Sequence, residues 1–294
     1  PALAVGCTCI LKPSEHTPLS AKIFSEIIEE AGYPPGVFNL INGDGPTVGT
    51  LLSKHKDVDM VSFTGSTRAG VLVSKNAADS VKRVTLELGG KSPTIIFPDA
   101  DIDAAIAGAA SAIFFNHGQC CCAGSRLFAH EKVFDKVTEG ISKIADQIKV
   151  GPGMDTSTEM GPLVSDEQFQ KVSGYIESGK SEGGEVVAGG KYDNSSGGHF
   201  VHPTVFAKTN ADMTLVKEEI FGPVVCAQPF SDENLEKIAN EANNTTFGLA
   251  ASVWTKNISV AHKLAGKIRA GTVWVNCHNI FDASLPFGGF KESG

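Results

Sequence analysis

The chain has 294 residues, of which 41% are hydrophobic and 20% charged, so it is long enough for a globular protein of two domains. Its formal net charge of −8, with scattered Lys and Arg, argues against a nucleic-acid-binding surface and favours small-molecule partners. No stretch reaches the roughly 18 apolar residues that a membrane span needs, and no signal peptide opens the sequence, so we expect no membrane partner and a cytosolic protein. The alternative is an organellar protein with a targeting segment upstream of Pro1.

Strands alternate with helices over the first 88 residues. Thr17 before Pro18 predicts a helix N-cap followed by proline at the first helical position, and the helix over 21–31 ends at Gly32. The pattern then predicts a strand over 36–41, a short helix over 47–55, a strand over 60–63, a helix up to 78 and a strand over 83–88. Such alternation predicts an α/β protein with a parallel sheet covered on both faces.

A glycine pair, Gly89-Gly90, interrupts this alternation, and we place a domain boundary there, between residues 1–89 and 90–294. The second series predicts helices over 101–115, 131–148, 165–182, 231–243 and 258–268, and strands over 93–97, 126–130, 184–188, 201–207, 223–228, 249–254 and 271–276. Two polar stretches, 151–162 and 191–198, are expected to be surface loops.

The seven cysteines lie at positions 7, 9, 120, 121, 122, 226 and 277. Their odd number and their spacing do not fit a secreted disulfide framework, so a reducing compartment is expected. No CxxC pair is present, and we therefore expect no metal site.

Three consecutive cysteines, Cys120, Cys121 and Cys122, follow an apolar helical pattern and lie in a turn between Gly118 and Gly124. A nucleophilic cysteine needs a lowered pKa, and such turns expose the backbone N–H groups that lower it. Free cysteines are also among the most buried residues, so a packing role is the alternative.

Two further positions carry possible chemistry. Glu87 lies at the end of a predicted strand, at the carboxyl edge where open α/β sheets place ligands, and partial burial would make it a general base near neutral pH. A solvated or paired glutamate is the alternative. His117 lies four residues before Cys121 and suggests a Cys-His hydrolase, although catalytic cysteine and histidine residues are normally distant in sequence.

A glycine-containing turn over 64–70 lies between a predicted strand and a predicted helix. Its glycines would let the backbone approach a phosphate at the helix N-terminus. Thr67 occupies the place of the middle glycine, so the standard dinucleotide fingerprint is absent, and a simple connection is the alternative.

Four segments together resemble the NAD(P)-dependent aldehyde dehydrogenases. They are Leu86-Glu-Leu-Gly-Gly-Lys-Ser-Pro93, Phe115-Asn-His-Gly-Gln-Cys-Cys-Cys-Ala-Gly-Ser-Arg126, Glu219-Ile-Phe-Gly-Pro223 and Pro286-Phe-Gly-Gly-Phe-Lys-Glu-Ser-Gly294. The resemblance implies a partial Rossmann-type cofactor domain followed by an α/β catalytic domain. It implies oxidation of an aldehyde to an acid with NAD, through a thiohemiacetal and a thioester on Cys121, with Glu87 as the base for deacylation.

The same resemblance implies the cofactor site. It assigns Lys12, Ser14 and Glu15 to the adenosine ribose, Gly65 and Ser66 to the pyrophosphate, and Glu219 and Phe221 to the nicotinamide ribose and ring. Because a carboxylate at position 15 accepts hydrogen bonds from ribose hydroxyls and repels a 2′-phosphate, NAD is favoured over NADP.

The implied substrate pocket is apolar. It contains Phe115, Phe281 and Phe287, as in broad-specificity members, with Cys120 and Cys122 beside the nucleophile. Aromatic walls suit apolar aldehydes, although core packing is the alternative for each ring. The stretch 277–286 resembles that of arylacetaldehyde dehydrogenases.

We expect the sequence to be part of a longer chain, because Pro1 follows no Met and Lys291–Gly294 ends in a polar turn. In the family pattern an oxyanion-hole asparagine lies upstream of Pro1, and strands that pair subunits lie outside both ends. The full chain is then expected to form a homodimer or homotetramer. A noncatalytic truncated product remains the other possibility.

Overall fold

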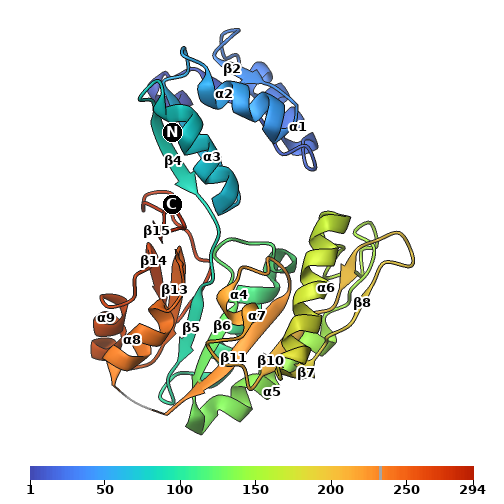
Figure 1. Ribbon diagram of the computed structural model, residues 1–294, viewed down its shortest axis with the longest axis vertical. Coiled ribbons are helices and arrows are strands. Elements are labelled where there is room, and N and C mark those ends of the chain that lie inside the picture. Colours follow the sequence, from blue (N-terminus) through green and yellow to red (C-terminus); the bar gives the residue numbers. More distant parts are fainter. Residues whose placement is uncertain (232–233) are drawn as a thin grey trace. The chain divides into compact units, whose positions relative to one another are not determined.

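The computed structural model describes residues 1–231 and 234–294. It divides into two compact units, of which the first comprises Pro1–Thr64 and Arg68–Thr85 and the second Gly65–Thr67 and Leu86–Gly294. Figure 1 shows their elements. Each unit has its own architecture, and the mixed α/β class expected from the sequence is confirmed.

The first unit alternates short strands and helices. In chain order it contains η1 (Leu3–Val5), β1 (Cys9–Leu11), α1 (Leu19–Glu30), β2 (Phe38–Leu40), η2 (Gly45–Gly49), α2 (Thr50–Lys54), β3 (Met60–Thr64), and most of α3 (Thr67–Ala78) and β4 (Arg83–Glu87). Thr67 of α3 and Leu86–Glu87 of β4 belong to the second unit. β1 pairs with β2 in parallel, and β3 pairs with β4. The predicted N-cap at Thr17 is wrong: Pro18 is itself the cap residue of α1, and no side chain accepts a hydrogen bond there.

The second unit begins with strands and helices that match the predicted series closely. These are β5 (Pro93–Ile96), α4 (Ile102–Phe114), η3 (Phe115–Gly118), β6 (Arg126–His130), α5 (Glu131–Gln147), α6 (Asp166–Ser181), β7 (Glu185–Ala188), β8 (Tyr192–Asp193), β9 (Phe200–Val201) and β10 (Thr204–Ala207). The rest comprises α7 (Thr214–Lys217), β11 (Val224–Phe230), α8 (Leu235–Asn243), β12 (Phe247–Gly248), β13 (Ala250–Trp254), α9 (Ile258–Ala265), β14 (Thr272–Val275) and β15 (Phe290–Lys291). Of the helix predicted over 231–243, residues 232–233 lie outside the described residues.

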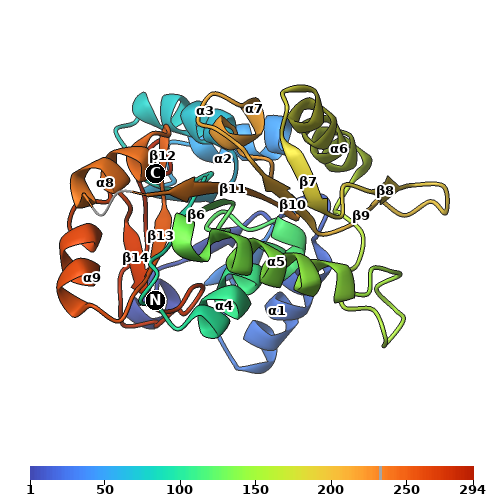
Figure 2. The same ribbon diagram turned by 90° about the horizontal axis from the view of Figure 1, so that it is seen from below.

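A seven-stranded sheet forms the centre of this unit, in the order β14-β13-β5-β6-β11-β10-β7. Every pairing is parallel except that of β10 with β7. Alternate residues of its strands enter different cores: Ile96 packs with α4 and α5, whereas Ile95 packs with α8 and α9. The helices thus cover both faces, as Figure 2 shows and as the alternation predicts.

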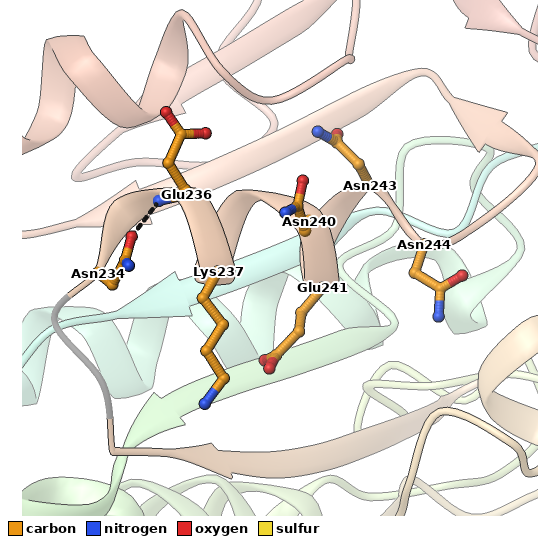
Figure 3. Close-up of a pocket in the computed structure, with 7 residues that line it drawn as sticks. All are labelled: Asn234, Glu236, Lys237, Asn240, Glu241, Asn243 and Asn244. Atoms are coloured by element: carbon orange, nitrogen blue, oxygen red, sulfur yellow. Dashed lines mark hydrogen bonds between the residues drawn. The ribbon is translucent and has the colours of Figure 1, made fainter.

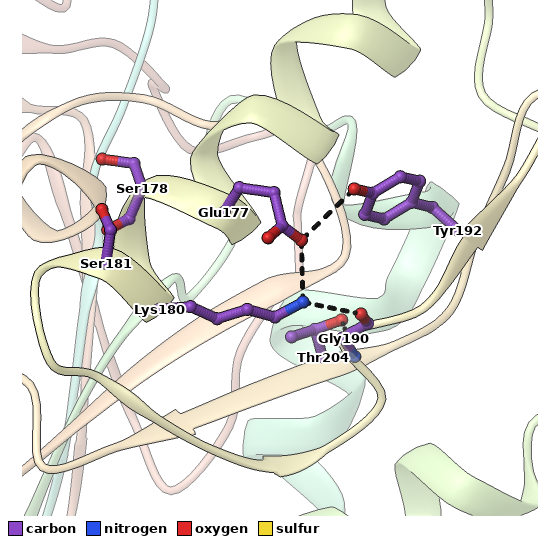
Figure 4. A network of polar contacts seen from close by, with 7 residues as sticks. All are labelled: Glu177, Ser178, Lys180, Ser181, Gly190, Tyr192 and Thr204. Atoms are coloured by element: carbon purple, nitrogen blue, oxygen red, sulfur yellow. Dashed lines mark hydrogen bonds and ion pairs between the residues drawn. The ribbon is translucent and has the colours of Figure 1, made fainter.

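The stretch expected as a polar loop over 191–198 is partly a hairpin, because β8 pairs antiparallel with β9. Figure 4 shows how α6 holds it: Glu177 Oε1 accepts from Lys180 Nζ at 2.7 Å and from the Tyr192 hydroxyl at 3.2 Å. The strand predicted over 201–207 is divided between β9 and β10. Pro203 lies in the gap and lacks the N–H that a continuous ladder needs.

The parallel strands bring four connecting loops to one edge of the sheet. The loops before β5, β6, β11 and β13 all reach the amino ends of their strands, which lie side by side in the sheet order. They contain Gly89-Gly90, the three cysteines, Glu219 with Phe221, and Leu249. The predicted catalytic motifs therefore meet at the amino edge of this sheet.

Candidate active site

The cysteine turn is shaped by three consecutive residues with left-handed backbone conformations, Asn116 (φ 50°), His117 (φ 63°) and Gly118 (φ 65°). They end α4 and turn the chain toward β6. A β-carbon on Gly118 would stand 2.1 Å from the carbonyl oxygen of Gly222, so only glycine fits this contact. The cysteine turn and the loop before β11 are therefore packed directly on each other.

Cys121 is half-buried and its backbone touches the loop before β5. A β-carbon on Gly90 would lie 2.1 Å from the carbonyl oxygen of Cys121. Cys120 and Cys121 also pack against a small core that contains Cys122, Leu249, Ala250 and Trp274. The predicted nucleophile is thus held by contacts from several strands, while its side chain keeps some exposure.

Glu87 ends β4, as the sequence predicts, and its Oε2 atom is buried without a hydrogen-bond partner among the described residues. Burial raises the pKa of this carboxyl group above its ordinary value. Ser293 fixes the residues that follow: its carbonyl accepts from Leu88 N–H at 2.9 Å, and its hydroxyl donates to the Gly89 carbonyl at 2.6 Å. A carboxylate with one buried, unpartnered oxygen among the described residues therefore lies just before the turn that packs on Cys121.

Glu219 joins the same turn, because its Oε1 accepts a 2.9 Å hydrogen bond from Gly90 N–H. A β-carbon on Gly89 would stand 2.5 Å from Glu219 Oε2. Burial raises the pKa of Glu219, and the hydrogen bond from Gly90 opposes that shift. Phe221 has a left-handed backbone (φ 57°), and its carbonyl accepts from Gln168 Nε2 at 2.7 Å.

The other predicted cofactor residues are divided between the units. In the first unit Lys12 Nζ donates to the Gly43 carbonyl at 2.9 Å and lies 3.8 Å from a Glu15 carboxylate oxygen, and Ser14 Oγ accepts from the His16 N–H at 3.3 Å. In the second unit Gly65 N–H donates to the Glu87 carbonyl at 3.0 Å, next to Ser66. Glu15 retains acceptor capacity, since it is half-exposed.

The aromatic residues separate into two groups. Phe281 stacks edge to face with both Trp274, at 5.5 Å, and Phe287, at 5.2 Å between ring centres. Phe115 is 60% exposed and makes no ring contact with them among the described residues. The structure brings two of the three predicted pocket rings together and adds Trp274, which the sequence analysis missed.

The three cysteine thiols form one hydrogen-bonded cluster, in which the Cys120 and Cys122 sulfurs lie 3.5 Å apart. Hydrogen bonds from the Cys121 and Cys122 thiols lower the pKa of Cys120 to about 3. The hydrogen bond with Cys120 raises the pKa of Cys121 to about 11, and the pKa of Cys122 is raised as well. Thiol contacts alone thus favour charge on Cys120 rather than on the predicted nucleophile.

His278 and Asn279 are partners of this cluster that the sequence analysis did not identify. His278 Nε2 lies 2.9 Å from the Cys122 carbonyl oxygen, and the Cys122 thiol donates to Asn279 Oδ1 at 3.2 Å. Burial lowers the pKa of His278, so the ring is neutral and Nε2 carries the proton. Positions so distant in sequence give no local signal that they meet.

The geometry of His117 does not suit a Cys-His hydrolase. Its Nε2 accepts a 3.1 Å hydrogen bond from Gly161 N–H, so the neutral ring carries its proton on Nδ1. The lone pair that would receive the Cys121 proton is therefore already used. His117 ties the cysteine turn to the loop that contains Gly161.

Two buried cations stabilise the loops around the site. Arg126 donates to the carbonyls of Lys91 at 2.8 Å, Ala242 at 2.6 Å and Glu241 at 3.4 Å, the last two in the final turn of α8. Lys91 Nζ donates to the Leu215 carbonyl at 2.7 Å, and burial lowers the pKa of Lys91 to about 8. Both groups thus donate to backbone carbonyls in the loop before β5, in α7 and in the last turn of α8, where a helix leaves carbonyls without an internal partner.

Other parts of the described chain carry no comparable chemistry. An open hollow of about 580 Å³ lies along α8 (Figure 3), and it is lined by Asn234, Glu236, Lys237, Asn240, Glu241, Asn243 and Asn244, none of them a predicted site residue. Within residues 1–231 and 234–294 no group of three or more His, Cys, Asp or Glu side chains is placed to hold a metal ion. In the same residues no helix is both long enough and apolar enough to cross a membrane.

Comparison with known proteins identifies the family. The family model described as "Aldehyde dehydrogenase family" matches residues 1–294. The putative aldehyde dehydrogenase DhaS of Bacillus subtilis is 50% identical over 293 residues, covering 100% of this chain and 59% of its own length. Human mitochondrial aldehyde dehydrogenase is 49% identical over 295 residues, covering 100% of this chain and 56% of its own.

Solved structures agree with this match. The NAD+ complex of the Bacillus cereus aldehyde dehydrogenase superposes with a TM-score of 0.96 at 51% identity, covering 99% of this chain and 59% of that one. The chain thus spans less than three fifths of the length of these relatives. The similarity in sequence and in fold extends over essentially all of its residues. The chain therefore belongs to the aldehyde dehydrogenase family.

Proposed function

We propose that the full protein oxidises an apolar aldehyde to its carboxylic acid with NAD, using Cys121 as the nucleophile and Glu87 as the base. The observation that carries the proposal is the Oε2 atom of Glu87, which is buried without a hydrogen-bond partner among the described residues and lies just before the turn that packs against Cys121. A buried polar atom without a partner is costly, and a bound water that reacts with the substrate would satisfy it. Family membership supports the reaction class.

Cys121 begins the reaction as a thiolate. Its sulfur attacks the aldehyde carbonyl carbon and forms a carbon–sulfur bond, which gives a thiohemiacetal. Loss of a hydride from that carbon and of the proton from its hydroxyl group re-forms the C=O bond and leaves a thioester on the same sulfur. The half-buried position of Cys121 suits both steps, because the sulfur is accessible and the backbone around it is fixed by Gly90.

Bound NAD would supply the acceptor for the hydride. The residues present fit such a ligand: Glu219 is a largely buried carboxylate held by the Gly90 N–H, and Glu15 is a half-exposed one, so both can accept hydrogen bonds from ribose hydroxyls. We assign Lys12 and Ser14 to the adenosine ribose together with Glu15. Gly65 and Ser66 are assigned to the pyrophosphate and Phe221 to the nicotinamide. Residues 1–89 thus supply part of the cofactor domain, and residues 90–294 the catalytic domain.

Glu87 completes the reaction by accepting a proton from the water that attacks the thioester carbon. The carbon–sulfur bond then breaks, and the acid leaves while Cys121 is restored. Because burial raises the pKa of Glu87, its ionised form is a stronger base than an ordinary glutamate. No side chain or backbone group of residues 1–231 and 234–294 forms a hydrogen bond with Oε2, which leaves that oxygen available for water.

The proposal extends to the substrate class and the cellular setting of the full protein. The edge-to-face rings of Phe281 and Phe287 support an apolar aldehyde, including arylacetaldehydes, over a charged one. Cys120 and Cys122 shape the pocket beside the nucleophile, and we include Phe115 in its wall. We also propose a cytosolic homodimer or homotetramer that binds neither nucleic acid nor membrane, consistent with the net charge of −8.

Two variants of the full-length protein test the proposal. Cys121→Ser should abolish aldehyde-dependent NADH formation, because an alcohol at this site is a far poorer nucleophile than a thiolate. Glu87→Gln should form NADH in a single burst and then stall before deacylation. Undiminished turnover in Cys121→Ser would exclude Cys121 as the nucleophile. Steady-state turnover at the wild-type rate in Glu87→Gln would exclude Glu87 as the base.

A further inference from the structure

The segment that follows β14 holds Cys122 at two points. His278 donates from Nε2 to the Cys122 carbonyl at 2.9 Å, and Asn279 Oδ1 accepts the Cys122 thiol proton at 3.2 Å. Cys122 is only 2% exposed, so water has little access to its sulfur. Both the backbone and the thiol of this cysteine are therefore fixed by two consecutive residues.

The Cys122 thiol has one proton and two possible acceptors. One is Asn279 Oδ1, and the other is the Cys120 sulfur at 3.5 Å. A carbonyl oxygen is a stronger acceptor than a neutral thiol sulfur, so the proton is directed to Asn279. While Asn279 holds this proton, Cys122 can offer Cys120 only sulfur lone pairs, so a Cys120 thiolate loses the hydrogen bond that Cys122 could donate to it.

This arrangement matters when the cluster loses a proton. A thiolate on Cys120 can accept hydrogen bonds from the Cys121 and Cys122 thiols, and Asn279 competes with it for the Cys122 proton. Within residues 1–231 and 234–294 no Lys or Arg side chain donates a hydrogen bond to these sulfurs. The titratable groups in contact with Cys122 include Cys120, Cys121, Cys277 and His278, and burial lowers the pKa of His278.

We propose that Asn279 is a positioning residue that holds the Cys122 proton away from Cys120 and so directs the reactive thiolate to Cys121. It acts through Cys122 and needs no contact with substrate. This inference rests on the proposed function only in taking Cys121 as the nucleophile. It also explains why three adjacent thiols can coexist without competing as nucleophiles.

The backbone of Asn279 provides the variants for a test. Its φ of 58° lies in the left-handed region, which Gly, Asn and Asp adopt most readily. Asn279→Gly therefore removes the acceptor and keeps the backbone. Asn279→Asp keeps an acceptor that cannot donate, so it also tests the direction of the hydrogen bond.

The experiment is limited alkylation of the full-length protein with iodoacetamide, without NAD or aldehyde, followed by mass spectrometry that locates the adduct. The reagent reports the thiolate, because the sulfur displaces iodide to form a carbon–sulfur bond. We expect wild type and Asn279→Asp to react chiefly at Cys121. In Asn279→Gly the ratio of Cys121 to Cys120 adducts should fall about tenfold, the effect of one hydrogen bond to a charged group.

A Cys122→Ala background is the matched control. In this background residue 122 has no thiol, so Asn279 has no thiol proton to accept. Adding Asn279→Gly should therefore leave the ratio of Cys121 to Cys120 adducts unchanged. An equal change in both backgrounds would mean that the loop has simply moved, and would overturn the inference. If Asn279→Gly does not fold, as judged by thermal unfolding, Asn279→Ala provides the second variant without an acceptor.

The outcomes separate this inference from the proposed function. Alkylation of wild type at Cys121, with the same ratio in Asn279→Gly, would overturn the role of Asn279 and leave the nucleophile in place. Alkylation of wild type chiefly at Cys120 would overturn both. Loss of Cys121 selectivity in Asn279→Asp as well as in Asn279→Gly would exclude Asn279 as the acceptor.

Discussion

The α-carbon of Gly90 lies against the carbonyl oxygen of Cys121, so closely that a β-carbon would stand 2.1 Å from it. The same residue donates its N–H to Glu219 Oε1 at 2.9 Å. One residue without a side chain thus joins the turn after Glu87, the cysteine turn and the loop before β11. A substitution there would disturb all three together.

Gly90→Ala should lower turnover of aldehyde at least tenfold, because relief of the contact requires the Cys121 backbone to move. Forced overpacking of this kind typically costs about 1–3 kcal/mol, so the protein should still fold. NADH formation and thermal unfolding measure the two effects. Gly153→Ala is the control, since nothing lies within 4 Å of its β-carbon position and its φ is ordinary. Equal activity in the two variants would contradict the prediction.

We expect the ionisation of Glu87 to determine how kcat changes on the acid side of the pH profile. The base must be ionised to accept a proton from water, so kcat should fall as pH falls through the pKa of Glu87. Burial raises that pKa, and the loss should therefore begin at a higher pH than for an ordinary glutamate. The profile of kcat against pH for wild type and Glu87→Gln measures it. If the fall of kcat at low pH persists unchanged in Glu87→Gln, a group other than Glu87 causes it.

We expect the hydrogen bonds of Arg126 to contribute to the free energy of unfolding. Arg126→Met keeps most of the apolar volume but removes the side-chain donor to the carbonyls of Lys91 and Ala242, whereas the Glu241 carbonyl still accepts from Asn244 N–H at 3.2 Å. Because each of the two unsatisfied groups costs about 1–3 kcal/mol, the free energy of unfolding should fall by about 2 kcal/mol or more. Urea unfolding measures it, with the exposed Arg83→Met as control, for which a change within about 0.5 kcal/mol is expected.

Long periodic elements were predictable from the sequence, because many residues contribute to each pattern. β6 is predicted with its observed bounds, Arg126–His130, and α5 to within one residue. α7, β12 and β15 have four residues or fewer and contain too little of a period to detect. The N-cap of α1 was misplaced because the pattern of Thr followed by Pro does not determine which residue first becomes helical.

The site was predictable only where its residues are near one another in sequence or form a motif. Glu87 ends its strand as expected, and Gly89-Gly90 interrupts the pattern as expected. Glycine is required at positions 89 and 90 because of tertiary contacts: Glu219 and Cys121 occupy the space that side chains there would need. The contacts of Cys122 with His278 and Asn279 join positions more than 150 residues apart, and no local pattern encodes them.

We expect the edge-to-face pair of Phe281 and Phe287 to determine which aldehydes the protein prefers. Phe281 packs edge to face between Trp274 and Phe287, so Phe281→Ala removes one wall and both ring contacts. The KM for phenylacetaldehyde should rise about tenfold, while that for acetaldehyde should change little, because a two-carbon aldehyde cannot reach an aromatic wall as a phenyl ring does.

Phe290→Ala is the matched control for this preference. Phe290 lies in β15 and is 51% exposed, against 57% for Phe281, but it makes no ring contact among the described residues. Steady-state kinetics with both aldehydes give the ratio of KM values for each variant. A parallel change for both aldehydes in Phe281→Ala would mean that Phe281 supports the loop after β14 and does not select substrate. A selective change confined to phenylacetaldehyde would place the ring in the pocket wall, because a general disturbance of the thiol cluster would affect both substrates.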